Sequence, residues 1–329
     1  MKKVLCVLLM ILMVTLSLTA AGRRDSGAAK PLTVVHCLIR EFQYGLAEAA
    51  GARAAVEEIA KRENRQINFT YFAPINFPDA AAQIEHIESA IAMGADFIII
   101  DAVNADVITP LAQRAIDMGI VITCSNSGVA DGVGLGTWAT DQNNCAAKAA
   151  DEMAKAIGGR GKVAVIGYGK GAPSSEIRAY AFEEHMQKTY PNIQVLPIEW
   201  AATADAIGSA DVARAYLAAH PDLVGMYAGN SMTTEGMLVG VRELGRAGSM
   251  TLIGYDSNSA VEAAVRDGSI YGCVMQSPYN MGYEAAKAGL EFITRGVRPT
   301  PPWFKDAGVY FMTKDNINSP EAQLLLKEW

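Results

Sequence analysis

The chain has 329 residues, of which 50% are hydrophobic and 19% are charged, and its formal net charge is −7. A disordered chain would contain fewer apolar residues, and a collagen would show a glycine period, so both classes are excluded. At roughly 100–200 residues per domain, the length fits two domains better than one. With 28 basic against 35 acidic residues and no basic run, we expect neither a nucleic-acid partner nor binding to an anionic membrane surface. The expected ligand is a small molecule.

The first 21 residues have the features of a secretory signal peptide. Two lysines precede an apolar stretch at residues 4–18, and small residues follow it. A helix of about 15 residues spans about 22 Å, which is short of the roughly 30 Å hydrocarbon core of a bilayer. We therefore expect export to the periplasm with removal of residues 1–21, and a flexible lead-in at residues 22–31.

The cysteines argue against a lipid anchor and against a disulfide framework. A lipoprotein would carry a cysteine just after the apolar stretch, whereas the only early cysteine, Cys6, lies inside it. Cys37, Cys124 and Cys273 fall in apolar runs, and no tight pairing pattern joins them to Cys145. We expect these four cysteines to be buried free thiols.

From residue 32 onward, short apolar runs alternate with longer stretches of helical period. Most of the runs are continuously apolar, which is typical of parallel strands covered on both faces. Between two of them, Ala80, Ile84, Ile87 and Ile91 place one apolar stripe on a helix. The strands expected in this first series are residues 33–39, 68–72, 97–100 and 119–123.

A second series of the same kind follows, and the junction falls near residues 140–144. Its expected strands are residues 163–166, 193–198, 224–227, 251–255 and 271–275. The fold class is therefore α/β, with two doubly wound parallel-sheet lobes joined by a hinge. The lobes are expected to comprise residues 32–140 with about 278–305, and residues 141–277. A helix at 279–294 and a strand at 309–312 follow, and the lobe of the returning segment 306–329 stays open.

Polar residues come directly after many of these strands. Ligands of open parallel sheets bind outside the carboxyl ends of the strands, although the same residue types are also common in turns. Carboxylates, amides and a guanidinium form paired hydrogen bonds with vicinal hydroxyls, and an aromatic ring covers the apolar face of a sugar. The pattern favours a neutral polyhydroxyl ligand. The strand-end residues are Asp101, Ser125, Asn126, residues 167–171, Glu199, Trp200, Asn230, Asp256 and Gln276.

Four polar residues, three of them at these strand ends, carry a resemblance to a known family by their order and local context. They are Arg178 in SSEIRAYAF, Asn230 in YAGN, Asp256 in IGYD and Gln276 in VMQ. From about residue 32 to 296 the chain resembles the periplasmic sugar-binding proteins of ABC importers, most closely the ribose-binding type. The resemblance implies type I periplasmic binding protein architecture. It also implies a sugar-like ligand, an ABC permease as partner and no enzymatic activity.

The resemblance also implies a set of ligand contacts. In that family an aspartate followed by an arginine contacts the ligand where this chain has Ser125 and Asn126, and this departure argues against ribose itself. Asp141 resembles an acidic residue near the inter-lobe crossing and could serve the hinge or the ligand. The ligand-binding residues implied by the family are Phe42, Tyr44, Ser125, Asn126, Asp141, Arg178, Trp200, Asn230, Asp256 and Gln276.

An exported oxidoreductase is the alternative. The loop GYGKGA at residues 167–172 fits a dinucleotide-binding fingerprint between a strand and a helix. However, the fingerprint needs an acidic residue about 20 positions on, and Glu199 lies 32 residues after Gly167. No G-x-S-x-G nucleophile motif is present, and the four histidines show no metal-ligand spacing. We expect no catalytic residue, cofactor or metal. We expect the protein to be a monomer, and sugar binding is also compatible with a chemoreceptor or sensor as a further partner.

Overall fold

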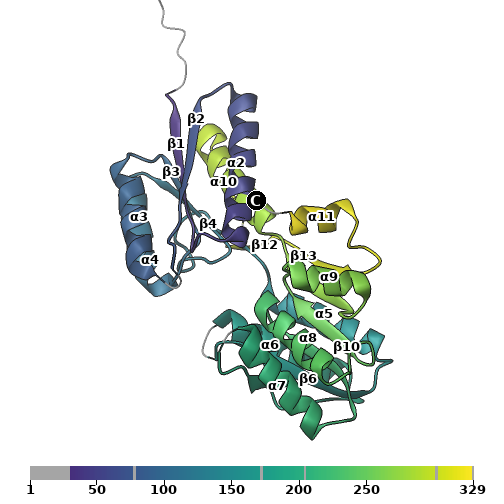
Figure 1. Ribbon diagram of the computed structural model, residues 1–329. Coiled ribbons are helices and arrows are strands. Elements are labelled where there is room, and N and C mark those ends of the chain that lie inside the picture. Colours follow the sequence, from purple (N-terminus) through teal and green to yellow (C-terminus); the bar gives the residue numbers. More distant parts are fainter. Residues whose placement is uncertain (1–29, 77–78, 171–172, 204, 301–302, 328–329) are drawn as a thin grey trace, which may run out of the picture.

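The computed structural model describes residues 30–76, 79–170, 173–203, 205–300 and 303–327. The expected signal peptide, its cysteine and most of the lead-in lie outside these described residues. Among the helices within them, none has the combined length and apolarity needed to cross a membrane. Figure 1 shows two lobes, each built on one sheet with helices on both of its faces.

The first lobe contains a six-stranded sheet in which every pairing is parallel. In spatial order its strands are β12 (Phe304–Asp306), β5 (Thr137–Ala139), β4 (Val121–Ser125), β3 (Phe97–Ile100), β1 (Leu32–Cys37) and β2 (Ile67–Phe72). One face is covered by α3 (Ala80–Ala92) and α4 (Ala105–Asp117), and the other by α2 (Gln43–Glu63) and α10 (Pro278–Arg295) (Figure 1). Four strands lie close to their expected positions, whereas β5 and β12 have only three residues each, too few for a periodicity to reveal.

The second lobe contains a seven-stranded sheet. In spatial order the strands are β13 (Val309–Thr313), β11 (Gly272–Gln276), β10 (Thr251–Tyr255), β9 (Leu223–Ala228), β6 (Gly161–Gly167) and β7 (Ile193–Val195), with β8 (Glu199–Trp200) also paired to β6. One face is covered by α5 (Gln142–Ala156) and α6 (Pro173–Thr189), and the other by α7 (Ala206–Ala219), α8 (Ser231–Glu243) and α9 (Ser259–Asp267).

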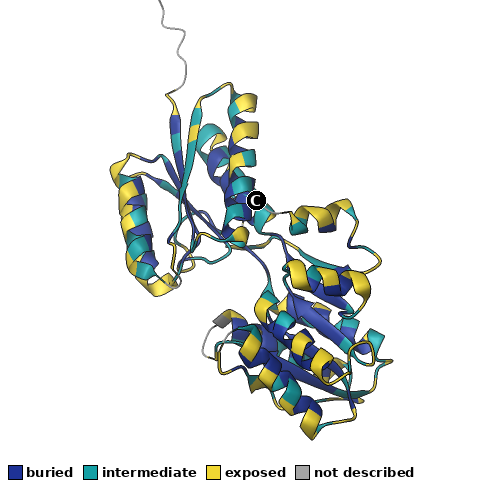
Figure 2. Cartoon of the chain, viewed as in Figure 1, coloured by how far each residue is buried: buried dark blue, intermediate teal, exposed yellow. Residues whose placement is uncertain are grey.

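The prediction of two doubly wound α/β lobes is confirmed. The central strands are buried on both faces, as their continuous apolar runs indicate, and Figure 2 shows this burial in both sheets. One strand differs from the expected all-parallel arrangement, because β13 pairs antiparallel with β11 at the edge of the second sheet. An antiparallel edge strand on an otherwise parallel sheet is common in doubly wound folds.

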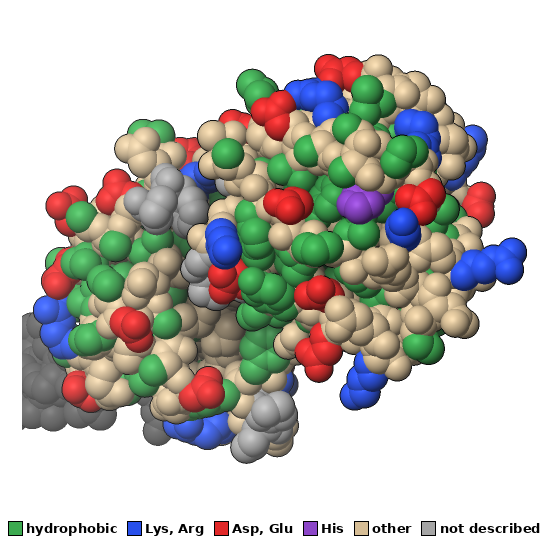
Figure 3. Space-filling view, turned by 90° about the horizontal axis from the view of Figure 1, so that it is seen from below, with side chains coloured by type: hydrophobic (Ala, Val, Ile, Leu, Met, Phe, Trp, Pro, Cys, Tyr) green, Lys and Arg blue, Asp and Glu red, His purple; other side chains and the backbone are tan. Residues whose placement is uncertain are grey.

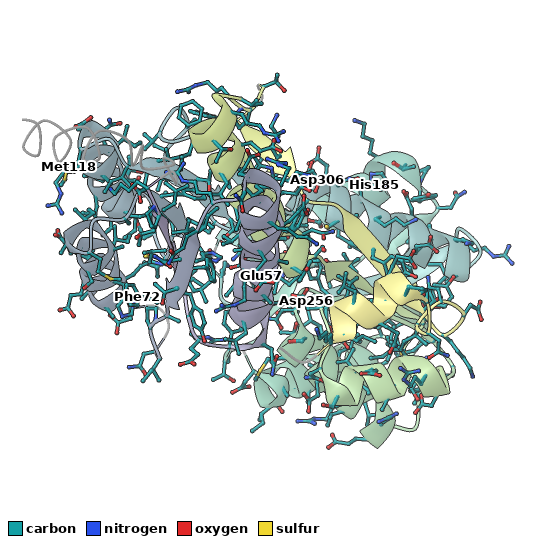
Figure 4. All side chains as sticks on the ribbon, turned by 90° about the horizontal axis from the view of Figure 1, so that it is seen from above. Glu57, Phe72, Met118, His185, Asp256 and Asp306 are labelled. Carbon is teal, nitrogen blue, oxygen red and sulfur yellow. The ribbon has the colours of Figure 1, made fainter. Side chains whose placement is uncertain are left out.

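The chain passes between the lobes three times. The passages follow β5, β11 and β12, and the first and third are joined by hydrogen bonds. Asp306, which is labelled in Figure 4, accepts at Oδ1 from the backbone N–H of Asp141 at 3.3 Å. The N–H of Ala307 donates to the carbonyl of Ala139 at 2.8 Å. These bonds tie two of the three passages into one unit.

The segment after the third passage packs with the second lobe. Its strand β13 pairs with β11, and a short helix, α11 (Pro320–Leu326), follows it. Ile317 and Ala322 are buried in the core of the second lobe. The structure thus places residues 309–326 with the second sheet, whereas α10 and β12 pack with the first.

The four described cysteines are buried and unpaired, as the sequence predicts. Burial raises the pKa of Cys37 and Cys273 to about 12 and that of Cys124 to about 11. A thiol is reactive as its thiolate, and burial keeps these thiols protonated at neutral pH.

Helices α2 and α10 pack with their backbones in close approach. A Cβ built on Gly51 would lie 1.9 Å from the carbonyl oxygen of Tyr279, and one on Gly282 would lie 2.0 Å from that of Glu48. Real Cβ atoms do not occupy such positions, so the two glycines are needed where the helices cross. This crossing fixes the start of α10, and with it the second passage between the lobes.

We predict that Gly51→Ala lowers the free energy of unfolding by about 1–3 kcal/mol, because the added methyl group must push the two helices apart. Glu57→Ala, on the exposed side of the same helix, is the matched control and should change it by less than about 0.5 kcal/mol. Urea unfolding followed by circular dichroism would measure both. Equal midpoints for Gly51→Ala and the wild type would contradict the assigned role of the crossing.

Candidate ligand-binding cleft

The second lobe holds a buried guanidinium at the ends of its strands. Arg178 on α6 is 6% exposed, and its Nη1 donates to the carbonyl of Gly229 at 2.8 Å. Its Nε donates to Oε1 of Gln142 at 2.7 Å, and the Tyr255 hydroxyl donates to the same oxygen at 2.7 Å. The guanidinium lies 3.8 Å from the centre of the Tyr255 ring, which stabilises a desolvated cation. Arg178 is therefore held rigidly by three neighbours.

Asp256 directly follows β10 with its backbone in the left-handed region, at φ 58°. Both carboxylate oxygens lie 3.1 Å from Nε2 of Gln276, which donates to them. Burial raises the pKa of Asp256, and the positive charge of Arg178 and the hydrogen bonds from Gln276 partly offset this rise. A half-buried carboxylate held in this way keeps acceptor capacity for a ligand hydroxyl.

An aromatic residue and an amide from the first lobe face this carboxylate. The Tyr44 hydroxyl at the start of α2 donates to Oδ1 of Asn126 at 3.1 Å. The same hydroxyl lies 3.4 Å from Oε1 of Gln276, so its one proton can serve either acceptor. Phe42 stacks on Tyr44 with ring centroids 5.8 Å apart and planes 10° apart. The first lobe thus presents two parallel aromatic rings and one amide.

These contacts form a continuous polar chain from one lobe to the other. It runs from Asn126 through Tyr44 and Gln276 to Asp256. A cavity of about 110 Å³ lies beside it, lined by α2, the second passage and Leu324 and other residues of the C-terminal segment. In Figure 4 Asp256 lies near the middle of the molecule, between α2 and α11. Typical ligand pockets hold roughly 300–1,000 Å³, so a ligand must enlarge this space or replace the direct contacts.

Three of the expected site residues, Ser125, Asp141 and Asn230, use their side chains for hydrogen bonds within one lobe or at a helix start. Ser125 lies within β4 rather than after it, and its buried Oγ is 3.0 Å from Nε2 of His36 inside the first lobe. Asp141 caps α5 by accepting the N–H groups of Asn143 and Asn144. This capping favours a hinge role for Asp141 over a ligand contact.

Asn230 is the N-cap of α8 and forms a capping box with Thr233. Its Oδ1 accepts the backbone N–H of Thr233 at 2.8 Å. Its Nδ2 has no hydrogen-bond partner among the described residues. The amide nitrogen therefore keeps its donor capacity, while its oxygen is used by the helix.

Trp200 lies beside the end of β6, separate from the polar chain. Its ring centroid is 5.9 Å from that of Tyr180, with planes 57° apart. A Cβ on Gly167 would lie 2.4 Å from the indole, so this position needs a glycine for packing against Trp200. That contact accounts for the first glycine of the dinucleotide-like loop, of which Gly171 and Ala172 lie outside the described residues.

Some central residues do not follow from the sequence pattern. Gln142 accepts from both Arg178 and Tyr255 and donates to Gln276 at 3.3 Å, which makes it the centre of the second-lobe network. In the sequence, Gln142 is marked only by its place at the start of a helix after the expected junction. Glu48 is fully buried on α2, and an acidic residue in a helix ordinarily indicates an exposed face.

We predict that Gln142→Leu lowers the free energy of unfolding by about 1–3 kcal/mol, because Arg178 Nε and the Tyr255 hydroxyl lose their buried acceptor. Gln194→Leu, on an exposed position of β7, is the control and should leave it nearly unchanged. Urea unfolding midpoints would test this. Equal midpoints for the two variants would mean that the Gln142 contacts do not stabilise the fold.

Known proteins share both the sequence pattern and the architecture. A family model described as a periplasmic binding protein domain matches residues 47–296. The chain is 26% identical over 198 residues to a D-ribose/D-allose-binding protein of Pseudomonas aeruginosa, a match that covers 58% of this chain and 61% of that protein. It is 24% identical over 307 residues to a xylitol-binding protein of Mycolicibacterium smegmatis, covering 93% and 84% of the two chains.

A solved structure extends the likeness to the three-dimensional fold. AraP, an arabinose-binding protein from Geobacillus stearothermophilus, aligns with a TM-score of 0.77 over 88% of this chain and 99% of that chain. The two sequences are 24% identical, so this match concerns the fold alone. Both lobes are included in an alignment of this extent.

Proposed function

The chain belongs to the periplasmic binding protein family, and from that premise we propose that it captures a neutral sugar or polyol between its lobes and delivers it to an ABC permease. The observation that carries this proposal is the polar chain across the cleft. Asp256, Arg178 and Gln276 come from the second lobe, with Gln276 at the start of the second passage, and Tyr44 and Asn126 come from the first lobe.

The chemistry of these groups suits hydroxyls. Asp256 accepts hydrogen bonds, Arg178 donates them, and the amide groups of Asn126 and Gln276 do both. The charges of one carboxylate and one guanidinium offset each other, which favours a neutral ligand over a sugar acid. Phe42 and Tyr44 supply stacked rings that can cover the apolar face of a sugar ring.

Binding between the lobes would favour a closed state. A ligand that touches Asp256 and Tyr44 at once has both contacts only when the lobes are near each other, so its binding shifts the equilibrium toward closure. The tied first and third passages act as the hinge in this proposal, with Asp141 and Asp306 as its hydrogen-bonded elements. The permease then binds the closed form, and a chemoreceptor or sensor could bind the same surface.

The polar residues of the first lobe are proposed to determine which sugars bind. Asn126 supplies an amide where ribose-binding relatives carry a charged pair, so this chain is proposed to select a different hydroxyl pattern. The curated relatives named for ribose, allose and xylitol support a small sugar or polyol as the class. Trp200 is proposed to reach the ligand only on closure.

The proposed location of the protein is the periplasm, and its proposed oligomeric state is a monomer. Residues 1–21 are proposed to direct export to the periplasm, without a lipid anchor, and the mature protein to act as a monomeric binding protein without enzymatic activity. On the face shown in Figure 3 acidic and basic side chains are interspersed, which supports a small-molecule ligand over a nucleic acid.

We predict that Asp256→Ala weakens binding of the cognate sugar by about 100-fold, because the ligand hydroxyls lose a charged acceptor. Asp131→Ala, on an exposed residue of the first lobe, is the matched control and should keep wild-type affinity. A thermal-shift screen with pentoses, hexoses, deoxysugars and polyols identifies the ligand, and calorimetry then gives the affinities. Unchanged affinity in Asp256→Ala would overturn the assigned site, and no shift with any sugar or polyol would overturn the function.

A further inference from the structure

Two carboxyl groups lie within hydrogen-bonding reach of each other inside the first lobe, behind the cleft. Glu48 on α2 and Asp101 after β3 are both 0% exposed. Neither oxygen of Glu48, nor Oδ2 of Asp101, has a hydrogen-bond donor among the described residues. Two ionised carboxylates side by side would repel each other in a medium of low dielectric constant. One proton between them removes the repulsion and supplies the missing donor.

We propose that Glu48 and Asp101 share one proton at neutral pH, and that this acid pair positions Asn126 and Tyr44 and so determines which sugars the first lobe accepts. The proposal rests on the function proposed above. It assigns a positioning role to two residues that lie behind the ligand-contacting wall.

The link from the acid pair to the cleft is a direct hydrogen bond. Asp101 Oδ1 accepts from Nδ2 of Asn126 at 3.1 Å, which turns Oδ1 of Asn126 toward the Tyr44 hydroxyl. Asn126 has φ 54°, so its backbone is also fixed in the left-handed region. Gln83 holds Asp101 from the other side, donating to its backbone carbonyl at 2.7 Å. A change in Asp101 is therefore transmitted to Asn126.

The surroundings of the pair favour retention of the proton. Burial raises the pKa of Glu48 well above its ordinary value, and the charge of Asp101 and a hydrogen bond with it add to the rise. Burial also raises the pKa of Asp101, to about 7, and hydrogen bonds from Asn126, Glu48 and backbone N–H groups partly offset this rise. His36 on β1 stays neutral because burial lowers its pKa to about 3. Burial raises the pKa of Tyr44, and the negative charge of the pair adds to this rise.

Other ionisable groups are either neutral or farther along the network. Burial raises the pKa of Cys124 on β4, and the charge of Asp101 adds to this rise, so the thiol remains protonated. Asp256 and Arg178 act on Tyr44 from the second lobe with opposite signs. The main groups that shift the pKa of Glu48 and Asp101 among the described residues include no lysine or arginine, which favours a proton over a cation as the neutralising group.

The donor, rather than the acid itself, is the essential element. Glu48→Gln keeps a donor toward Asp101 without a proton to lose, whereas Glu48→Leu removes that donor and leaves Oδ2 of Asp101 as a buried acceptor without a partner. Asn126 and Tyr44 should then lose their fixed arrangement. The ranking of sugars should change with Glu48→Leu and return largely to the wild-type order with Glu48→Gln.

The first test does not involve a ligand. Infrared difference spectroscopy of the wild type should show the C=O band of a protonated carboxyl group at pH 7.5, and Glu48→Gln should lack it. Because a raised carboxyl pKa makes the folded state bind more protons than the unfolded state, wild-type stability falls as pH rises above the ordinary pKa of a glutamate. Each excess proton shifts the unfolding constant tenfold per pH unit, and Glu48→Gln should remove one such step. Absence of the band would overturn proton sharing.

The second test measures sugar binding. Calorimetry across the panel of sugars and polyols should show at least tenfold weaker binding to Glu48→Leu and a changed ranking, with most of the loss rescued in Glu48→Gln. Glu57→Gln on the same helix is the control. An unchanged ranking in Glu48→Leu would overturn the positioning role. If the wild type bound no sugar, the proposed function and the selectivity role would both fail, while the infrared band would still decide on proton sharing.

Discussion

The contact between Tyr44 and Gln276 is the interaction on which the arrangement of the cleft depends. Gln276 ends β11 at a passage between the lobes, and its amide reaches the first lobe with its oxygen and Asp256 with its nitrogen. A planar amide can do both because it carries an acceptor and a donor on one rigid group. The Gln276 side chain thus contacts both walls of the cleft and sets their relative position.

The packing of the helices explains why this contact can form. The glycine crossing of α2 and α10 brings the start of α2, which carries Tyr44, next to the start of α10, which follows Gln276 by two residues. Larger residues at Gly51 and Gly282 would separate the two ends. Close backbone packing on one face of the first sheet therefore determines the geometry of a site at its edge.

The sequence predicts the lobes better than it predicts the site. Residues 97–100 and 251–255 coincide with β3 and β10, since continuously apolar runs report burial on both faces. Asp256 and Gln276 follow from their place after strands and from family resemblance, and Arg178 follows from the resemblance alone. Glu48 and Gln142 could not be found in this way, because their roles depend on partners 53 and 36 or more residues away that only the folded chain brings near. Ser125 and Asn230 stay predictions as ligand contacts, since a polar residue at a strand end can equally serve a strand or a helix cap.

The central claim is that a neutral sugar or polyol binds between the lobes and closes them. Small-angle X-ray scattering of the protein, recorded with and without each member of the panel, tests this claim most directly. Our account predicts that at least one sugar or polyol reduces the radius of gyration at saturating concentration while the others leave it unchanged. A ligand that binds tightly without any change in the radius of gyration would contradict closure around the polar chain.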